Sequence, residues 1–224
     1  MKYFFYLTIT LLNMFVHSVS QAYVVPTYRD IKPATQVMLE RQSFGAPVAA
    51  SANRIVAATA GATSAAIATL SAFTLQPDVS RNVVITPGGT TTDIESCVIV
   101  VNGTNFFNKV ISENFTFAVD AVAATTGAKA FKTVTSVVFP ANCESGTFGA
   151  TWSIGVGEKI GLKRCMAIAG DWVWSTVGGV YEATRATVVV NSTAVESNTA
   201  DFAGTMDGSA VFLGTFIQNF ICKP

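Results

Sequence analysis

The feature that most constrains this fold is a series of short β-branched and aromatic segments between residues 83 and 139, separated by Gly, Asn and Pro. Val, Ile, Thr and Phe dominate these segments, and such residues favour the pleated, half-buried surface of a strand. We expect strands at 83–86, 97–101, 106–117 and 131–139. Regularly spaced short strands are typical of an all-β sandwich or barrel. The sequence therefore predicts an all-β fold, an antiparallel β-sandwich of jelly-roll or immunoglobulin-like type, with an extended N-terminal arm.

Turn residues separate the expected strands. We expect turns at Pro87-Gly88-Gly89 and at Asn102-Gly103, and a loop over the Ala-, Thr- and Gly-rich residues 121–130. Gly, Pro and Asn accept the backbone conformations that turns require.

The flanking segments are less clearly patterned. Residues 54–75 are expected as two strands joined by a turn at Gly61, with a short helix over 64–72 as the alternative. Glycines alternate with apolar residues over 155–162, and in a strand they mark a bulge or a tight bend more often than a ligand loop. Val188-Val189-Val190 is expected as a buried strand.

Charge is scarce and balanced in this chain. Charged residues make up 12% of the sequence, and 14 basic residues match 14 acidic ones. Such a charge distribution provides no electrostatic attraction to nucleic acid or to an anionic membrane. A weakly charged surface is also poorly protected against association. We therefore expect a chain that works in an assembly as a homo-oligomer without nucleic acid, with a monomeric β protein as the alternative.

The first 22 residues resemble a secretory signal. Lys2 precedes an apolar stretch over 3–16, and Ser20-Gln21-Ala22 has the small-x-small pattern of a cleavage site. The apolar stretch is about 14 residues long, shorter than the roughly 20 needed to span a bilayer. We therefore expect no stable membrane span. The alternatives to export are an uncleaved arm and a segment upstream of a working start at Met38.

Proline placement suggests an arm before the folded domain. Pro26, Pro33 and Pro47 interrupt any helix, and an extended Pro-containing segment lies readily on a partner surface. The expected regions are a signal-like or non-native apolar segment at 1–22, an extended arm or linker at 23–53, and one β-sandwich domain at 54–224.

Four cysteines are scattered along the chain, at positions 97, 143, 165 and 222. No Cys-x-x-Cys pair occurs and no His lies near them, so the spacing does not indicate a zinc site. Four cysteines allow three complete pairings. We expect free thiols that pack as small core residues, with disulfide pairing as the alternative.

Catalytic patterns are weak. The single histidine, His17, lies in the N-terminal apolar segment, so the domain offers no His to activate a Ser or Cys nucleophile. The glycines of 155–161 lack the strand–helix context of a dinucleotide site. A hydrolase with two converging carboxylates stays as the least favoured alternative. We predict a non-enzymatic protein with no catalytic residue, no cofactor and no metal ligand.

The tryptophans are the best candidates for contact with a partner. Trp172 and Trp174 would share one face of a strand, and their flat rings could stack on a carbohydrate. We favour the alternative that both point into the core or a subunit interface. The candidate interaction residues are Trp152, Trp172, Trp174, Phe44 and Pro47.

A set of motifs stands out between residues 39 and 222. They are QPDVSRN at 76–82, VVNGTN at 100–105, VISENF at 110–115, GAKAFKTVTS at 127–136 and GVGEKIGL at 155–162. Together they resemble a module found in structural proteins of tailed bacteriophages. Ser80 stands where that module has Pro, and residues 105–108 replace a more Gly-rich turn.

The resemblance implies a virion structural protein, most often a head-decoration or cement protein and otherwise a tail component. Capsid or tail subunits would be its partners and the virion its location, with residues 1–37 outside the module. The alternative is an exported β-sandwich protein, secreted or periplasmic, that binds carbohydrate or a surface through its tryptophans.

Overall fold

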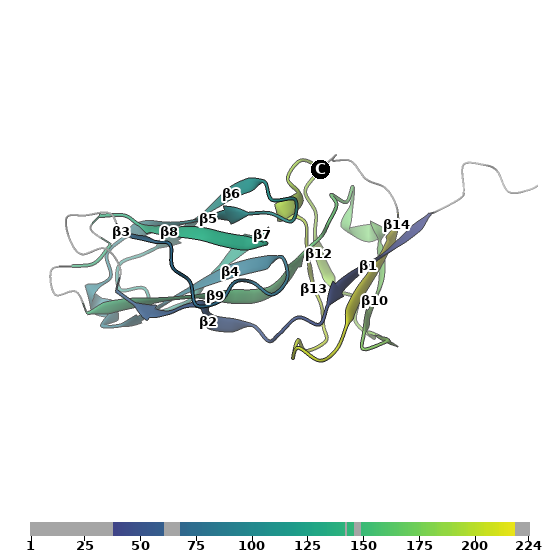
Figure 1. The fold of residues 1–224 in the computed structure, drawn as a ribbon, viewed down its shortest axis with the longest axis horizontal. Coiled ribbons are helices and arrows are strands. Elements are labelled where there is room, and N and C mark those ends of the chain that lie inside the picture. Colours follow the sequence, from purple (N-terminus) through teal and green to yellow (C-terminus); the bar gives the residue numbers. More distant parts are fainter. Residues whose placement is uncertain (1–37, 61–67, 142, 146–148, 218–224) are drawn as a thin grey trace, which may run out of the picture. The chain divides into compact units, whose positions relative to one another are not determined.

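A computed structural model describes residues 38–60, 68–141, 143–145 and 149–217 of the chain (Figure 1). Within them every strand pairing is antiparallel, and the helices are single 3-10 turns at Thr91–Asp93, Ala169–Asp171 and Val195–Ser197. The strands are β1 (Leu39–Gly45), β2 (Ser51–Thr59), β3 (Ala68–Leu70), β4 (Arg81–Gly89), β5 (Cys97–Thr104), β6 (Val110–Phe117), β7 (Thr125–Phe131), β8 (Thr133–Phe139), β9 (Ala150–Gly161), β10 (Trp172–Val177), β11 (Val180–Tyr181), β12 (Thr187–Val189), β13 (Thr199–Asp201) and β14 (Phe212–Ile217). The all-β prediction is confirmed.

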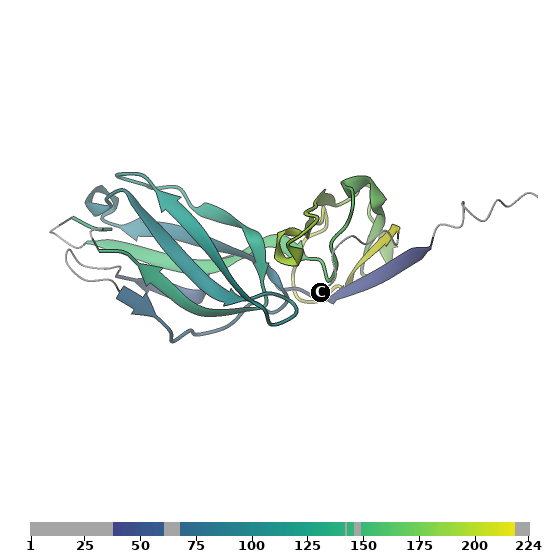
Figure 2. The same cartoon turned by 90° about the horizontal axis from the view of Figure 1, so that it is seen from above.

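The strands form three sheets, which we name A, B and C (Figures 1 and 2). Sheet A has the order β1-β14-β10-β11. Sheet B has the order β12-β13-β9-β4-β7, with β2 also paired to β9. Sheet C has the order β3-β8-β5-β6. The signal-like segment, the expected turn at Gly61 and Cys222 lie outside the described residues.

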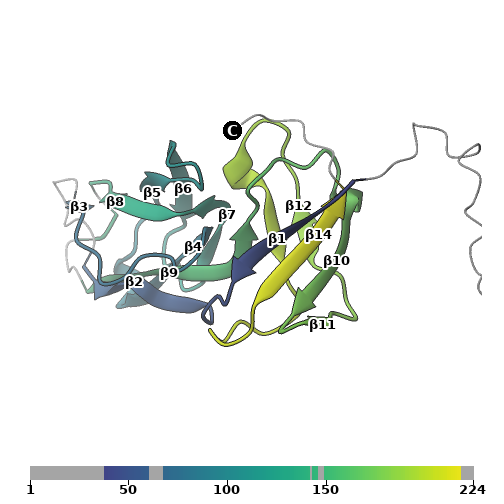
Figure 3. The ribbon, with the colours of Figure 1, turned by 45° about the vertical axis from the view of Figure 1, so that its right-hand side comes forward.

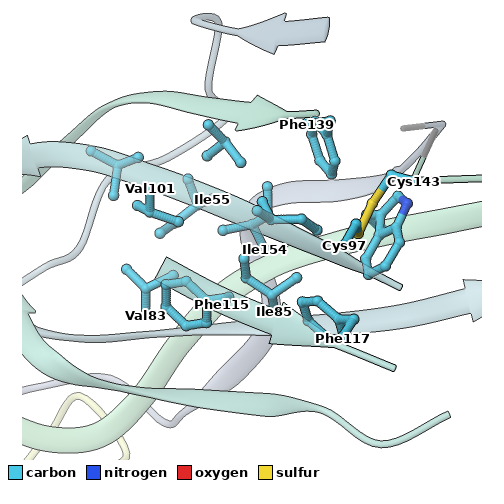
Figure 4. Packing of buried hydrophobic residues seen from close by; sticks show 14 of the residues in the cluster. Ile55, Val83, Ile85, Cys97, Val101, Phe115, Phe117, Phe139, Cys143 and Ile154 are labelled. Carbon is cyan, nitrogen blue, oxygen red and sulfur yellow. A yellow bond between two sulfur atoms is a disulfide. The ribbon is translucent and has the colours of Figure 1, made fainter. Parts of the chain in front are cut away.

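Sheets B and C enclose the first hydrophobic core, in a sandwich arrangement. Strand β5 shows why the sequence packs this way: Cys97, Ile99 and Val101 are buried, while Val98 between them is exposed. This two-residue period places every second side chain on the face that meets the other sheet. Figure 4 shows the facing side chains, which include Ile55, Val83, Ile85, Phe115, Phe117, Phe139 and Ile154.

A disulfide bond joins two parts of this first core. Cys97, at the start of β5, is bonded to Cys143, which is 46 residues away in sequence and 5.2 Å away between Cα atoms (Figure 4). Cys165 is disulfide-bonded as well. The expectation of free thiols is therefore wrong for the described cysteines. Spacing in the sequence could not reveal the pairing, because the fold alone brings distant Cα atoms within bonding range.

A second core is formed by sheet A, β13 and the end of β9. Trp172 lies at its centre and is fully buried. Its ring stacks on Phe216 at 5.9 Å between centroids and meets Phe202 edge-on at 5.7 Å. Phe44 of β1 completes the group, at 6.3 Å from Trp172. Aromatic pairs in these geometries stabilise a core beyond the area that they bury.

One long strand, β9, contributes to both cores. Trp152 and Ile154 belong to the first core, and Ile160 to the second. One edge of β9 pairs with β4. The other edge pairs with β2 in its first half and with β13 at its end.

The prediction of an extended N-terminal arm is wrong after residue 38, where the chain enters the folded domain as a strand. Residues 39–45 form β1, in which Gln42 and Phe44 are buried while Ser43 between them is exposed. This alternation marks a strand with one face on a core, and β1 pairs along its length with β14. Pro47 lies in the connection to β2, where a missing N–H costs no sheet hydrogen bond.

Three local predictions fail where strands continue through turn-like residues. Pro87-Gly88-Gly89 lies inside β4 and pairs with β9, and Asn102-Gly103 lies inside β5. The turn between β5 and β6 comes later, where the Asn105 side-chain oxygen accepts hydrogen bonds from the backbone N–H groups of Phe107 and Lys109 at 3.0 and 3.1 Å. The expected loop at 121–130 contains most of β7.

Strand β12 was predicted to be buried, and it instead lies at an edge of sheet B. Val188 is half-buried against the second core, while its neighbours Thr187 and Val189 are exposed. Consecutive valines are therefore no guide to burial here, because an edge strand contacts the core with one face only.

Candidate functional site

The described residues contain no group of three or more His, Cys, Asp and Glu side chains arranged to hold a metal ion. The same residues include no helix with the length and apolar character that crossing a membrane requires. Two features remain as candidate sites: the outer face of sheet A and a pocket between the two cores.

The QPDVSRN segment at 76–82, which contributes to the sequence resemblance, holds neighbouring parts of the fold together through hydrogen bonds. Gln76 acts as a strand partner for β8: its Oε1 accepts from the backbone N–H of Val134 at 2.8 Å, and its Nε2 donates to the carbonyl of the same residue at 3.1 Å. Asp78 accepts a hydrogen bond from the backbone N–H of Val48 at 2.8 Å. The segment thus ties β8 and the β1–β2 connection to the start of β4.

Arg81 is fully buried near the boundary between the two cores. Its Nε donates to the carbonyl oxygen of Gly157 at 2.7 Å, and its Nη1 donates to the carbonyl of Val48 at 2.9 Å. Asp78 forms an ion pair with it at 3.2 Å. Burial lowers the pKa of Arg81, and the Asp78 carboxylate opposes this effect. A buried charge with these partners holds β9 and the β1–β2 connection in place, because losing one partner would leave the charge unpaired.

Asn82 lies beside Arg81 and joins the irregular parts of two neighbouring strands. The pairing of β4 with β9 shifts register after Arg81, and its pairing with β7 shifts after Asn82. Asn82 is fully buried; its Oδ1 accepts from the N–H of Lys159 at 3.0 Å and its Nδ2 donates to the carbonyl of Gly127 at 3.2 Å. One side chain therefore satisfies backbone groups that both bulges remove from the ladder.

The bulge in β7 has a second support. Glu113 of β6 accepts hydrogen bonds through Oε1 from the N–H groups of Ala128 and Lys129, at 2.6 and 3.2 Å. Burial raises the pKa of Glu113, while these backbone donors work in the opposite direction. Glu113 thus holds the backbone of the β7 bulge in place.

The glycines of β9 allow close approach of neighbouring chain segments. A Cβ atom at Gly157 would lie 2.5 Å from Nδ2 of Asn82, and one at Gly161 would lie 2.5 Å from Cβ of Ala130. At Gly155 it would overlap the carbonyl of Ser51. The glycines thus lie within β9, whose register with β4 and with β2 shifts, as the prediction of a bulge there requires.

The five candidate interaction residues differ in how far they are exposed to solvent. Phe44, Pro47, Trp152 and Trp172 are buried, so they are core residues in this structure. The Trp152 indole Nε1 donates to Oε1 of Glu144 at 3.2 Å. Trp174 is the one candidate whose ring reaches solvent, with 37% of the residue exposed.

Trp174 lies on the outer face of sheet A, which Figure 3 displays with β1, β14, β10 and β11 side by side. Trp174 pairs with Thr215, and Thr215 pairs with Arg41, so the three share this face. Tyr181 is on the same face, is 67% exposed, and meets the Trp174 ring edge-on at 6.1 Å. The sequence singled out Trp174 but not Tyr181, because the pairing of Tyr181 with Thr176, two residues after Trp174, brings the two rings together. The expectation that Trp172 and Trp174 share one face of a strand is wrong, because the register shift between them turns Trp172 into the second core.

Three aliphatic side chains extend this aromatic pair. Leu39 and Ile217 are register partners, and Leu213 pairs with Thr176 beside Tyr181. We call this set, Leu39, Ile217, Leu213, Trp174 and Tyr181, the outer apolar face. Arg41, which is charged, lies on the same side of sheet A, opposite Thr215.

A pocket of about 440 Å³ opens between the two cores. Its apolar wall consists of Phe44, Pro77, Val79, Phe106 and Ile160. Asp78, Lys132 and Lys163 are its charged residues. The residues that line the pocket thus come from β1, the segment before β4, the β5–β6 turn, the β7–β8 link and the end of β9.

Comparison of the chain with known protein families, with curated proteins and with solved structures found no match.

Proposed function

We propose that this chain is a non-enzymatic structural protein that adheres to neighbouring subunits through the outer apolar face of sheet A. The observation that carries the proposal is the exposed Trp174–Tyr181 pair, which shares with Leu39 a face that no described strand covers. Tryptophan, tyrosine and arginine side chains are enriched at the buried centres of protein interfaces.

Strand β1 strengthens this interpretation because it lies at an edge of sheet A. Among the described strands only β14 pairs with it, so its other edge can accept a further strand. Edge pairing and an apolar face together provide the main-chain hydrogen bonds and the buried area that a stable subunit contact needs.

The setting that we propose is the virion of a tailed bacteriophage, as a capsid decoration or cement protein. The support is the sequence resemblance carried by QPDVSRN and the motifs after it. Disulfide bonds persist on virion surfaces and in other oxidising environments, and Cys97–Cys143 is consistent with that setting. Capsid or tail subunits and further copies of the chain would be its partners.

The test is incorporation into particles of the phage that encodes the chain. We expect the double variant Trp174→Ser, Tyr181→Ser to fold but to be present on purified particles at about one tenth of the normal copy number or less, because two interface anchors are lost. Val189→Ser is the matched control, since Val189 is also exposed but lies on β12 of sheet B. Quantitative mass spectrometry of purified particles measures the effect, and equal incorporation of both variants would contradict the proposal.

An exported binding protein is the second candidate. The same disulfide bonds suit a secreted or periplasmic protein, and the exposed Trp174–Tyr181 pair offers ring faces for a carbohydrate. The mature N-terminus separates the two candidates: a chain that begins at Tyr23 supports export, whereas one that begins at Met1, Met14 or Met38 supports the particle protein. Truncation experiments should stop at residue 37, because β1 begins at Leu39.

A further inference from the structure

The pocket between the two cores is lined by residues that the adhesive face does not use. Its floor and walls combine rings and aliphatic groups from Phe44, Val79, Phe106 and Ile160. Pockets of this size that are largely apolar, with a few polar groups at defined positions, are the usual form of small-molecule sites.

The negative charge in the pocket is already engaged. One oxygen of Asp78 accepts from the backbone N–H of Val48, and the other pairs with the fully buried Arg81. Asp78 and Arg81 therefore offset each other beneath the pocket, and the carboxylate has little attraction left for a bound cation.

The two lysine side chains of the pocket, Lys132 and Lys163, are less fully engaged in interactions within the protein. The Nζ of Lys163 lies 5.2 Å from the centroid of the Phe106 ring, on the pocket wall. Lys132 donates one hydrogen bond, to Oδ1 of Asn108 at 2.9 Å, and an ammonium group has three donors. Two lysines thus line a largely apolar space whose carboxylate is paired.

We propose that this pocket binds a small organic carboxylate with an aromatic or short aliphatic body. The apolar body would contact Phe44, Phe106 and Ile160, and the carboxylate would accept hydrogen bonds from Lys163 and Lys132. Charge-assisted hydrogen bonds of this kind are stronger than neutral ones.

The test uses two probes of similar shape, 3-phenylpropionate and the uncharged 3-phenylpropanol, with the full chain. Titration followed by calorimetry or by NMR shifts gives both affinities. We expect the carboxylate to bind at least about fivefold more tightly than the alcohol at low salt, and the preference to shrink at high salt.

Variants locate the preference within the pocket. Lys163→Gln and Lys132→Gln should each reduce the affinity for phenylpropionate about threefold to tenfold and leave that for phenylpropanol nearly unchanged. Lys109→Gln is the matched control, because it removes the same charge from the exposed end of the β5–β6 turn, outside the pocket. Phe106→Ala should weaken both probes, because it removes part of the apolar wall.

Three outcomes would overturn the proposal: equal affinity for the two probes, a preference that survives both lysine substitutions, or no binding of either probe. The Trp174→Ser, Tyr181→Ser variant should bind phenylpropionate normally, because those rings lie outside the pocket. Failure of the pocket and failure of the adhesive face are therefore distinguishable. Thermal unfolding of each variant, measured alongside, shows that it is folded.

Discussion

The two cores are built in different ways. The first core is mainly aliphatic and contains several Phe side chains. Most of its residues come from strands β3 to β9, which follow one another in the chain. A disulfide bond cross-links it. The second core is centred on Trp172 and joins β1, near the start of the described chain, to β14 at its end. Contacts between distant segments cost more chain entropy, so the second core depends more strongly on the quality of its packing.

The region between the cores explains how they can cooperate. Strand β9 runs through both, and Arg81 and Asn82 of β4 hold its bulged part. We therefore expect the second core to be lost more easily than the first, and damage near Arg81 and Asn82 to affect both.

The largest expected effect comes from the centre of the second core. Trp172→Ala should destabilise the protein by about 4 kcal/mol, because it empties the space among Phe44, Phe202 and Phe216. Hydrogen exchange should then accelerate in β10 and β14 while β5 and β8 stay protected. Trp152→Ala, an equally buried tryptophan of the first core, is the matched variant and should expose β5 and β8 instead. Equal loss of protection in all four strands would show that the cores unfold as one unit.

A smaller effect is expected at Asn82. Asn82→Ala leaves the N–H of Lys159 and the carbonyl of Gly127 without their partner, which should cost about 2 kcal/mol in the free energy of unfolding. Denaturant unfolding measures the loss. Asn102→Ala is the control, because that side chain only donates to the Ser136 hydroxyl in a partly buried position. A cost no larger than that of the control would mean that the bulges are held by the backbone alone.

The smallest effect concerns pH and the first core. Burial raises the pKa of Glu113 above its ordinary value of 4.5, so the folded protein holds this proton more tightly than the unfolded chain does. Stability from this group is therefore fully present below pH 4.5 and declines as the pH rises through the raised pKa. The change should stay under about 1 kcal/mol, because the carboxyl is partly solvated.

Unfolding free energies between pH 4 and 7 measure this dependence. Glu113→Gln should remove that part of the slope, and Glu158→Gln, at an exposed position, should leave it in place. An unchanged slope in Glu113→Gln would assign the pH dependence to other groups.

Much of the first core could be predicted from alternation along single strands. In β5 every second residue is buried, so the strand and its core face follow from the sequence pattern. Strand β7 could not be predicted in this way. Its Ala-, Thr- and Gly-rich sequence has no clear period, and its bulge depends on Glu113 and Asn82, which lie on other strands.

The candidate sites were less predictable than the strands. The sequence drew attention to tryptophans, but Trp152 and Trp172 occupy the two cores and only Trp174 faces solvent. Tyr181, Lys132 and Lys163 had no signal of their own, because a single exposed aromatic or lysine is ordinary in any sequence. Their significance arises from neighbours that are distant in the chain.

The sequence by itself determined the all-β class, the strands with a two-residue period and the structural use of the glycines in β9, because these depend on local sterics and on which side chains avoid water. The tertiary structure alone decided the pairing of Cys97 with Cys143, the incorporation of β1 into sheet A and the burial of Arg81. These features depend on contacts between segments that are distant in the sequence. Many side chains together supply the free energy of such contacts, so no single segment predicts them.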